Sequence, residues 1–167
     1  MDAPTAKELE DPQKKNLLPF DESVGYQIRQ TSRLIQRCLQ QKIEPHGVTL
    51  GMWYFLRALW HEDGMTQREL SLVVGTMEPT TLTAIKSMEI SGLVRRVKNQ
   101  DDRRKINIYL TERGKALKAE LMPLAKEVVD NSVRGFSDRE RAGLLEYLKA
   151  IQGNLSDDSA GKLDVTE

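Results

Sequence analysis

The organisation of this chain follows from residues 65–118, which read MTQRELSLVVGTMEPTTLTAIKSMEISGLVRRVKNQDDRRKINIYLTERGKALK. Thr66 and Glu69 have the spacing of a capping box, in which each side chain accepts a hydrogen bond from the backbone of the other residue. Gly75 is expected to end the helix that begins there, because glycine adopts the left-handed conformation at little steric cost. The predicted apolar face of this helix consists of Leu70, Val73 and Val74.

A second helix is predicted between Pro79 and Gly92. Proline suits a first helical turn, because the N–H group that it lacks has no partner there. One side of this helix is formed by Leu82, Ile85 and Met88 or Glu89. The other side is formed by Thr80, Thr83, Ala84 and Ser87. Two helices joined by a short turn predict a helix-turn-helix, whose second helix is presented to the major groove of DNA.

A basic β-hairpin is predicted directly after these helices. Residues 93–97 and 106–110 alternate between apolar and polar side chains, as half-buried strands do, and the polar sequence KNQDDRRK joins them. Positions 95–105 hold six basic and two acidic residues, whereas the whole chain has 25 of each. The basic residues are Arg95, Arg96, Lys98, Arg103, Arg104 and Lys105. This local excess of positive charge is typical of a DNA-binding wing.

These motifs together resemble the winged helix of the MarR family of bacterial transcriptional regulators. The resemblance is carried by TQREL at 66–70, PTTLT at 79–83, MEISGLV at 88–94, DRR at 102–104 and LTERG at 110–114. It covers about residues 24–155 and is strongest over 66–118. It implies a mainly α fold with a small β wing, in which a winged helix-turn-helix lobe is joined to N- and C-terminal dimerisation helices.

The expected organisation is one domain over residues 21–155. The DNA-binding lobe is expected at about 49–111, and the dimerisation helices at about 22–43 and 112–155. Residues 1–20 carry three prolines and many charges and are expected to form a flexible arm, whereas residues 156–167 are expected to be a disordered acidic tail. Pro123 is expected to kink or break the helix that Thr111 caps. The helices outside the lobe have surplus apolar surface, which predicts self-association, and the resemblance implies a two-fold homodimer.

DNA contacts are expected from the second helix and the wing. The residues concerned are Thr80, Thr81, Thr83, Ala84, Lys86, Ser87, Arg95, Lys98, Arg103, Arg104 and Lys105. Hydroxyl groups can hydrogen-bond to base edges and a threonine methyl can contact thymine, while lysine is better suited to phosphate. The family often has arginine at the position of Thr83, so the resemblance does not imply guanine recognition there. Arg103 and Arg104 are minor-groove or phosphate candidates, and Arg104 is the better candidate to brace the hairpin through Asp102.

An effector site is implied by the resemblance, between the helix at about 49–63, the first helix and the DNA-binding lobe. The candidate residues are Arg29, Arg33, Trp53, Arg57, Trp60 and His61. Arginine can hold a carboxylate with two hydrogen bonds and indole can stack on a ring, so a small anionic effector, such as an aromatic carboxylate, is expected. The alternative is that both tryptophans are core residues and that the arginines form a solvated helix face.

The leading functional hypothesis is a ligand-responsive repressor that binds a pseudo-palindromic operator on double-stranded DNA. One alternative is a regulator that senses thiol oxidation through Cys38, although this residue is predicted on an apolar helix face, where a buried thiol is inert. Another is a winged-helix adaptor between proteins without DNA affinity. The sequence has two histidines without tight ligand spacing and no nucleophile–base motif, so we expect no metal site, no cofactor and no enzyme.

The composition also predicts the cellular compartment of the protein. Hydrophobic residues make up 39% of the chain and charged residues 30%, and no apolar run approaches the ~18 residues needed to span a bilayer. The first residues lack the apolar core of a secretory signal, and the single cysteine rules out an internal disulfide. A cytoplasmic protein without a membrane partner is therefore expected.

Overall fold

The computed structural model describes Pro19 and residues 22–160, with side chains as far as Ser156. The predicted flexible arm therefore lies almost entirely outside the described residues, as does the part of the predicted tail after Ala160. The elements in chain order are α1 (Val24–Ile43), the short 3-10 helix η2 (Glu44–His46), α2 (Leu50–His61), α3 (Gln67–Val74), α4 (Glu78–Ile90), β1 (Val94–Lys98), β2 (Ile106–Leu110), α5 (Glu112–Ser132) and α6 (Asp138–Ala160).

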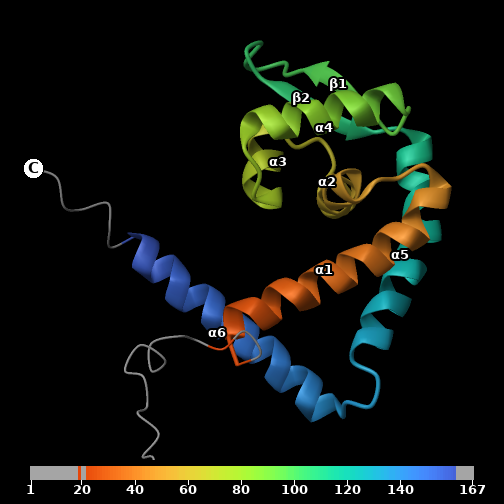
Figure 1. The fold of residues 1–167 in the computed structure, drawn as a ribbon. Coiled ribbons are helices and arrows are strands. Elements are labelled where there is room, and N and C mark those ends of the chain that lie inside the picture. Colours follow the sequence, from red (N-terminus) through yellow and green to blue (C-terminus); the bar gives the residue numbers. More distant parts are fainter. Residues whose placement is uncertain (1–18, 20–21, 161–167) are drawn as a thin grey trace, which may run out of the picture.

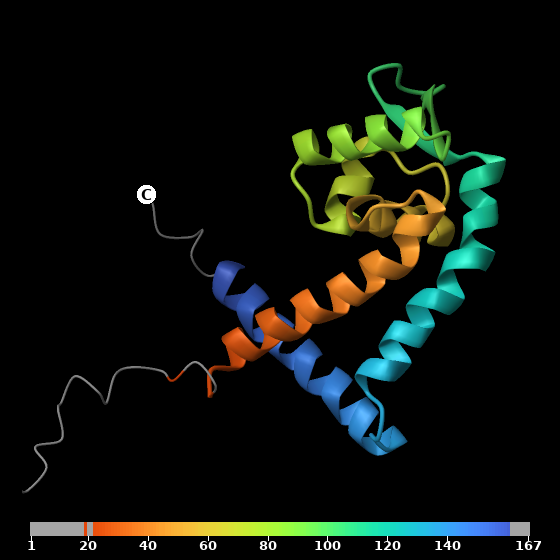
Figure 2. The ribbon, with the colours of Figure 1, turned by 45° about the vertical axis from the view of Figure 1, so that its right-hand side comes forward.

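The elements form two parts, a lobe made of α2, α3, α4 and the β1–β2 hairpin, and a frame made of the long helices α1, α5 and α6. Helices α2, α3 and α4 pack together beside the antiparallel hairpin of β1 and β2 (Figure 1). Helices α1 and α5 pack against each other where they leave this lobe, and α6 turns back from the far end of α5 to cross below α1 (Figures 1 and 2). This is the expected fold, mainly α with a small β wing.

One apolar core joins the lobe to the frame. Its fully buried members come from every layer and include Ile43, Leu56, Leu59, Leu70, Ile85, Met88, Leu93, Ile108 and Leu121. Because Leu121 of α5 belongs to the same cluster as Met88 of α4, the frame and the DNA-binding lobe share their packing. A fully buried aliphatic side chain contributes about 1.5–3 kcal/mol relative to an exposed one.

The helix ends follow short-range chemistry, as predicted. Thr66 and Glu69 form the complete capping box at α3, and Gly75 ends that helix with a φ of 71°. The hydroxyl of Thr111 accepts a hydrogen bond from the Gly114 N–H at the start of α5. These caps satisfy N–H groups that would otherwise lack partners in the first turn.

Three expectations about these helices are wrong. Val73 is 61% exposed, because α3 buries Leu70 and Ser71 and turns Val73 outward. Of the kink or break expected at Pro123, the break is wrong, because α5 continues to Ser132 along the curved path seen in Figure 2. Pro123 and Ala119 are both exposed, so water can satisfy the Ala119 carbonyl that loses its partner.

The third correction concerns the end of the chain. Helix α6 runs to Ala160, so residues 156–160 belong to a helix and not to a disordered tail. A capping box of Ser137 and Glu140 starts α6, and its hydrogen bonds hold the pKa of Glu140 below the ordinary value. Within the part of the chain that the structure describes, no helix is long and apolar enough to cross a membrane.

Candidate nucleic-acid interface

Helix α4 presents one face to solvent and anchors the other in the core. Ile85 and Met88 are fully buried, and the shortness of the α3–α4 turn places the start of α4 beside the end of α3. The exposed side chains are Thr80, Thr83, Lys86 and Ser87, and Ala84 is half-buried among them. This is the face that the sequence predicted for DNA contact.

The predicted DNA contact through Thr81 is wrong. Its side chain is fully buried, and its hydroxyl donates a hydrogen bond to the Met77 carbonyl and lies 2.8 Å from the hydroxyl of Thr76. Thr81 therefore ties the α3–α4 turn to the first turn of α4. Thr80 is exposed and Thr81 is buried because successive helical residues point about 100° apart.

The wing begins with two arginines that already have partners. Arg95 lies across from Tyr109 in the strand register, and its guanidinium is 5.1 Å from the centre of the Tyr109 ring, a cation–π distance. Arg96 Nε donates a 2.8 Å hydrogen bond to Glu89 Oε2 of α4. The Arg95–Tyr109 contact stabilises the hairpin, and the Arg96–Glu89 ion pair attaches the hairpin to α4.

The tip of the wing is ordered by side chain to backbone hydrogen bonds. Asn99 Oδ1 accepts from the N–H groups of Asp101 and Asp102, each at 2.9 Å. Asp102 Oδ1 in turn accepts from Arg104 Nε and from the Arg104 N–H, each at 3.1 Å. The expected brace between Arg104 and Asp102 is therefore confirmed, and the Arg104 side-chain hydrogen bond holds the pKa of Asp102 below its ordinary value.

Three basic side chains remain for an external anion. Lys98, Arg103 and Lys105 are exposed, and none of them forms an ion pair within the described residues. Lys86 on α4 is likewise exposed and forms no ion pair within the described residues. Unpaired cations on a projecting hairpin and on an exposed helix face suit phosphate groups, because neutralising phosphates releases counterions.

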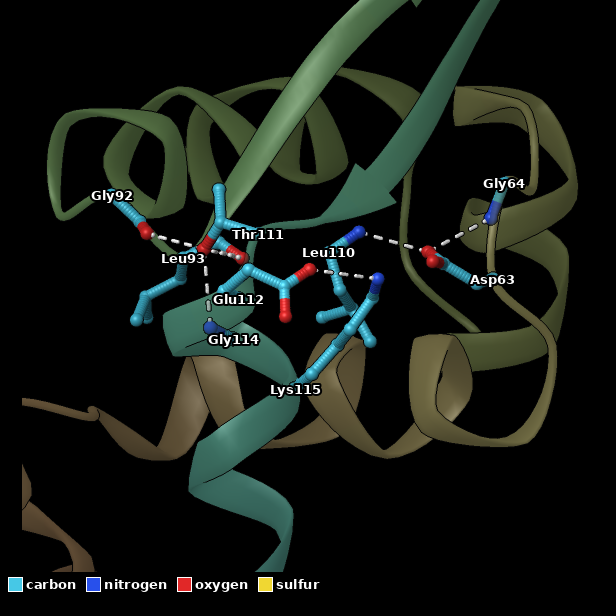
Figure 3. Close-up of polar contacts among 9 residues, drawn as sticks. All are labelled: Asp63, Gly64, Gly92, Leu93, Leu110, Thr111, Glu112, Gly114 and Lys115. Atoms are coloured by element: carbon cyan, nitrogen blue, oxygen red, sulfur yellow. Dashed lines mark hydrogen bonds and ion pairs between the residues drawn. The ribbon is translucent and has the colours of Figure 1, made fainter.

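The base of the wing is held by residues whose role the sequence analysis missed (Figure 3). Asp63, in the segment between α2 and α3, accepts hydrogen bonds at Oδ1 from the Leu110 N–H at 2.8 Å and from the Gly64 N–H at 3.0 Å. Thr111 donates its hydroxyl hydrogen to the Gly92 carbonyl at 2.6 Å, across the mouth of the hairpin. The Asp-Gly pair at 63–64 is the signal that points to such a turn.

The predicted effector residues are not gathered in one place. A surface hollow of about 650 Å³ between α2 and α3 is lined by Tyr54, Arg57, His61, Glu62 and apolar side chains. Arg33 lines a different hollow between α1 and the start of α2, and the exposed Arg29 lies further along α1. Of the six candidates, the structure brings only Arg57 and His61 together at a common hollow.

The two tryptophans are core residues that pack edge to face, with ring centres 5.7 Å apart. Trp53 is 2% exposed, and the Arg57 guanidinium lies 5.7 Å from its ring centre. Trp60 is half-buried and donates a hydrogen bond from Nε1 to the Gly114 carbonyl. Neither ring lines the α2–α3 hollow, so stacking of an effector on indole finds no support there.

The expected burial of Cys38 is also wrong. Its side chain is exposed and lines a groove between α1 and α5, together with Leu34, Ile35 and Val128. Helix α1 buries Leu39 and Ile43, which lie one position and five positions further along and so face a different direction. Elsewhere among the described residues, no three His, Cys, Asp or Glu side chains gather where they could hold a metal ion.

A helix-turn-helix followed by a basic, braced hairpin defines a winged-helix DNA-binding fold. Residues 48–106 match the sequence profile of the MarR family. The crystal structure of a MarR transcriptional regulator from Methanosarcina mazei Go1 is 32% identical, with a TM-score of 0.75 over 80% of this chain and 96% of that one. The chain belongs to the MarR family, and it is therefore a DNA-binding transcriptional regulator and not an enzyme.

Two further proteins illustrate the similarity. The transcriptional repressor NicR of Pseudomonas putida is 27% identical over 145 residues, which is 86% of this chain and 90% of that protein. The structure of the Staphylococcus aureus MepR–DNA complex shares the fold, with a TM-score of 0.75 and 23% identity over 79% of this chain and 98% of that chain.

Proposed function

We propose that this chain is a homodimeric repressor that binds a pseudo-palindromic operator and is released by a small anionic effector. The observation that carries the proposal is the combination of an exposed α4 face with a wing whose Lys98, Arg103 and Lys105 have no internal ion pair among the described residues. The solved complex of MepR with DNA, which has the same fold, supports DNA as the partner. An operator-binding protein works beside the chromosome, so we propose the cytoplasm as its location.

The homodimer is supported by apolar side chains that the single chain leaves uncovered. Helices α1 and α6 expose Val24, Ile28, Leu34, Leu144, Leu145 and Tyr147. Helix α6 packs little against the rest of its own chain, and Figure 2 shows it running back past α1, outside the lobe. A long helix with uncovered apolar residues is stable when a second copy covers them. A two-fold dimer places its two α4 helices in half-sites about one helical turn, ~10 bp, apart.

The repressor role is supported by the similarity to NicR. The effector site is supported by the α2–α3 hollow, where Arg57 and His61 offer donors to a carboxylate beside the apolar side chains of Ala58, Met65 and Val74. Glu62 also lines the hollow, so the attraction of Arg57 for an anion must outweigh the repulsion from this carboxylate. A ligand bound there releases DNA only when it prefers the conformation that does not bind DNA.

DNA binding is tested by fluorescence anisotropy with duplexes enriched from a randomised pool, over a series of salt concentrations. We expect a pseudo-palindrome and a steep salt dependence. Arg103→Ala is expected to lower the salt slope by about one unit for each phosphate that the variant no longer neutralises. Arg104→Ala is the matched control: its side chain braces Asp102, so we expect a smaller change in slope. Failure to enrich any sequence would contradict the proposal and favour an adaptor between proteins.

The effector is tested with benzoate as the probe, and with benzamide and cyclohexanecarboxylate as controls for charge and aromaticity. We expect benzoate to weaken operator binding by the wild type and to have less effect on Arg57→Gln. Equal effects on both proteins would exclude Arg57 from the site.

Thiol sensing through Cys38 is a second candidate, which the exposure of this side chain favours. Peroxide is then expected to release the wild type from DNA and to leave Cys38→Ser bound. Equal responses of the two proteins would reject it.

A further inference from the structure

Helix α4 has one side chain of the kinds that most often read bases by paired hydrogen bonds, Lys86. Arginine or lysine reads guanine, and asparagine or glutamine reads adenine, by two hydrogen bonds to one base edge. The structure describes every residue of α4, and none of its thirteen residues is arginine, asparagine or glutamine. The other exposed side chains on the predicted DNA face of this helix are small, so apart from Lys86 they must read the major groove by single contacts.

The hydroxyl hydrogen of Thr83 is already used inside the helix. Thr83 Oγ1 donates a 3.0 Å hydrogen bond to the carbonyl oxygen of Pro79, one turn earlier. This fixes the side chain in the rotamer that points Oγ1 back along the helix. What the exposed side chain offers to a ligand is therefore its methyl group and an oxygen without a hydrogen to donate.

The surroundings of Thr83 are suited to an apolar contact. Thr83 is exposed at the middle of α4, and its neighbours one turn away on the same face, Thr80 and Ser87, are small and exposed. The next exposed side chain, Lys86, is long enough to reach phosphate while the helix lies close to the bases. Small neighbours permit that close approach, which a methyl–methyl contact requires.

We propose that Thr83 is a specificity-determining residue that reads the 5-methyl group of thymine, so that each operator half-site carries a thymine opposite the middle of α4. This inference rests on the proposed operator binding. It assigns the methyl group and not the hydroxyl to base reading, because the hydroxyl is committed to the Pro79 carbonyl. Thymine is the natural base that carries a methyl group in the major groove.

The test removes the methyl group either from thymine or from Thr83. An operator duplex is first enriched by the wild type from a randomised pool, and each symmetric pair of thymines is then replaced in turn by deoxyuridine. Dissociation constants are measured for the wild type, Thr83→Ser and Thr83→Val. Serine keeps the hydroxyl and its internal hydrogen bond without the methyl, and valine keeps the methyl without the hydroxyl. Circular dichroism checks that both variants fold.

We expect one symmetric position at which deoxyuridine weakens binding by the wild type and by Thr83→Val about fourfold per half-site, the effect of one buried methyl group. Thr83→Ser should bind the thymine duplex correspondingly more weakly and should not distinguish thymine from deoxyuridine at that position. Thr80→Ser is the matched control on the same helix face, and it should keep the discrimination at that position.

Two outcomes would overturn the inference while operator binding stands. In one, the wild type enriches a sequence but tolerates deoxyuridine at every position. In the other, Thr83→Ser keeps the same preference for thymine, or Thr83→Val loses it. If the wild type enriches no sequence at all, the proposed function fails and this inference fails with it.

Discussion

The indole Nε1 of Trp60 donates a 2.8 Å hydrogen bond to the carbonyl oxygen of Gly114. Trp60 lies in the last turn of α2 and Gly114 in the first turn of α5, so this bond joins the DNA-binding lobe to the frame. The first turn of α5 also holds the wing, because Thr111 donates to the Gly92 carbonyl at the hairpin mouth (Figure 3). Three elements that are distant in the sequence therefore meet at one joint.

Removing the indole donor should loosen that joint. Trp60→Phe keeps most of the apolar surface but removes the indole donor from the Gly114 carbonyl, which still accepts a hydrogen bond within α5. We therefore expect the free energy of unfolding to fall by about 0.5–1.5 kcal/mol. Urea denaturation measures this at a fixed protein concentration, because an oligomer gains stability with concentration. Lys115→Ala is the control, because Lys115 forms an exposed ion pair with Glu112 within α5, and this variant should stay within about 0.5 kcal/mol of the wild type. An unchanged urea midpoint for Trp60→Phe would contradict the structure.

Gly114 is expected to tolerate no side chain. A Cβ atom there would clash with the Leu93 carbonyl oxygen, which is backbone and cannot rotate away. We expect Gly114→Ala to lower the free energy of unfolding by about 1–3 kcal/mol, the usual cost of overpacking. Gly51→Ala is the matched control in α2, because its Cβ atom would lie 3.8 Å from Thr49 Oγ1, in ordinary contact. That variant should gain up to about 1 kcal/mol in helix propensity. Equal effects of the two substitutions would contradict the predicted clash.

The capping box of α3 should make stability depend on pH. Hydrogen bonds from the Thr66 N–H and hydroxyl hold the pKa of Glu69 below the ordinary value of 4.5. The ionised carboxylate therefore contributes stability above pH 4.5, and this contribution is lost as the pH falls through the lower folded-state pKa. Glu69→Gln cannot titrate, so its urea midpoint should lie below that of the wild type at neutral pH and approach it in acid. A constant difference across the pH range would show that the charge is not involved.

The uncovered face of α6 gives a prediction about assembly. Leu145 is 57% exposed in the single chain, and a charge there would oppose burial against a second copy. Leu145→Asp is expected to sediment as a monomer at concentrations at which the wild type is a dimer. Leu72→Asp is the control, because Leu72 is 73% exposed on α3, outside the frame helices. A Leu145→Asp dimer as stable as the wild-type dimer would exclude this residue from the interface.

Several features of the fold were predictable because they depend on neighbours within a few residues. The capping box of Thr66 and Glu69, the helix end at Gly75 and the cap at Thr111 all follow from local hydrogen bonding and backbone freedom. The alternation of apolar and polar residues in the hairpin and the hydrogen bond between Arg104 and Asp102 could also be predicted from near neighbours in the sequence. Most of the predicted DNA-contact residues are exposed for the same reason, since they share a helix face or a loop.

The burial of some single residues was not predictable in this way. Helical spacing did not show that Val73 points outward. Nor did it show that Trp60 contacts α5 rather than an effector. Each of these outcomes depends on which element packs against the residue, and the partners lie far away along the chain. The burial of Thr81, in contrast, could have been predicted, because Thr81 has the i, i+4, i+7 spacing with Ile85 and Met88.

By itself, the sequence determined where α3 begins and ends, where α5 begins, where the hairpin folds and which segment carries the positive charge, because those properties arise from interactions over about one helical turn. Only the tertiary structure decided which basic residues keep a free charge and how Asp63, Trp60 and Thr111 join the wing to α2 and α5. The physical reason is that burial and pairing depend on residues that become neighbours only when the core forms.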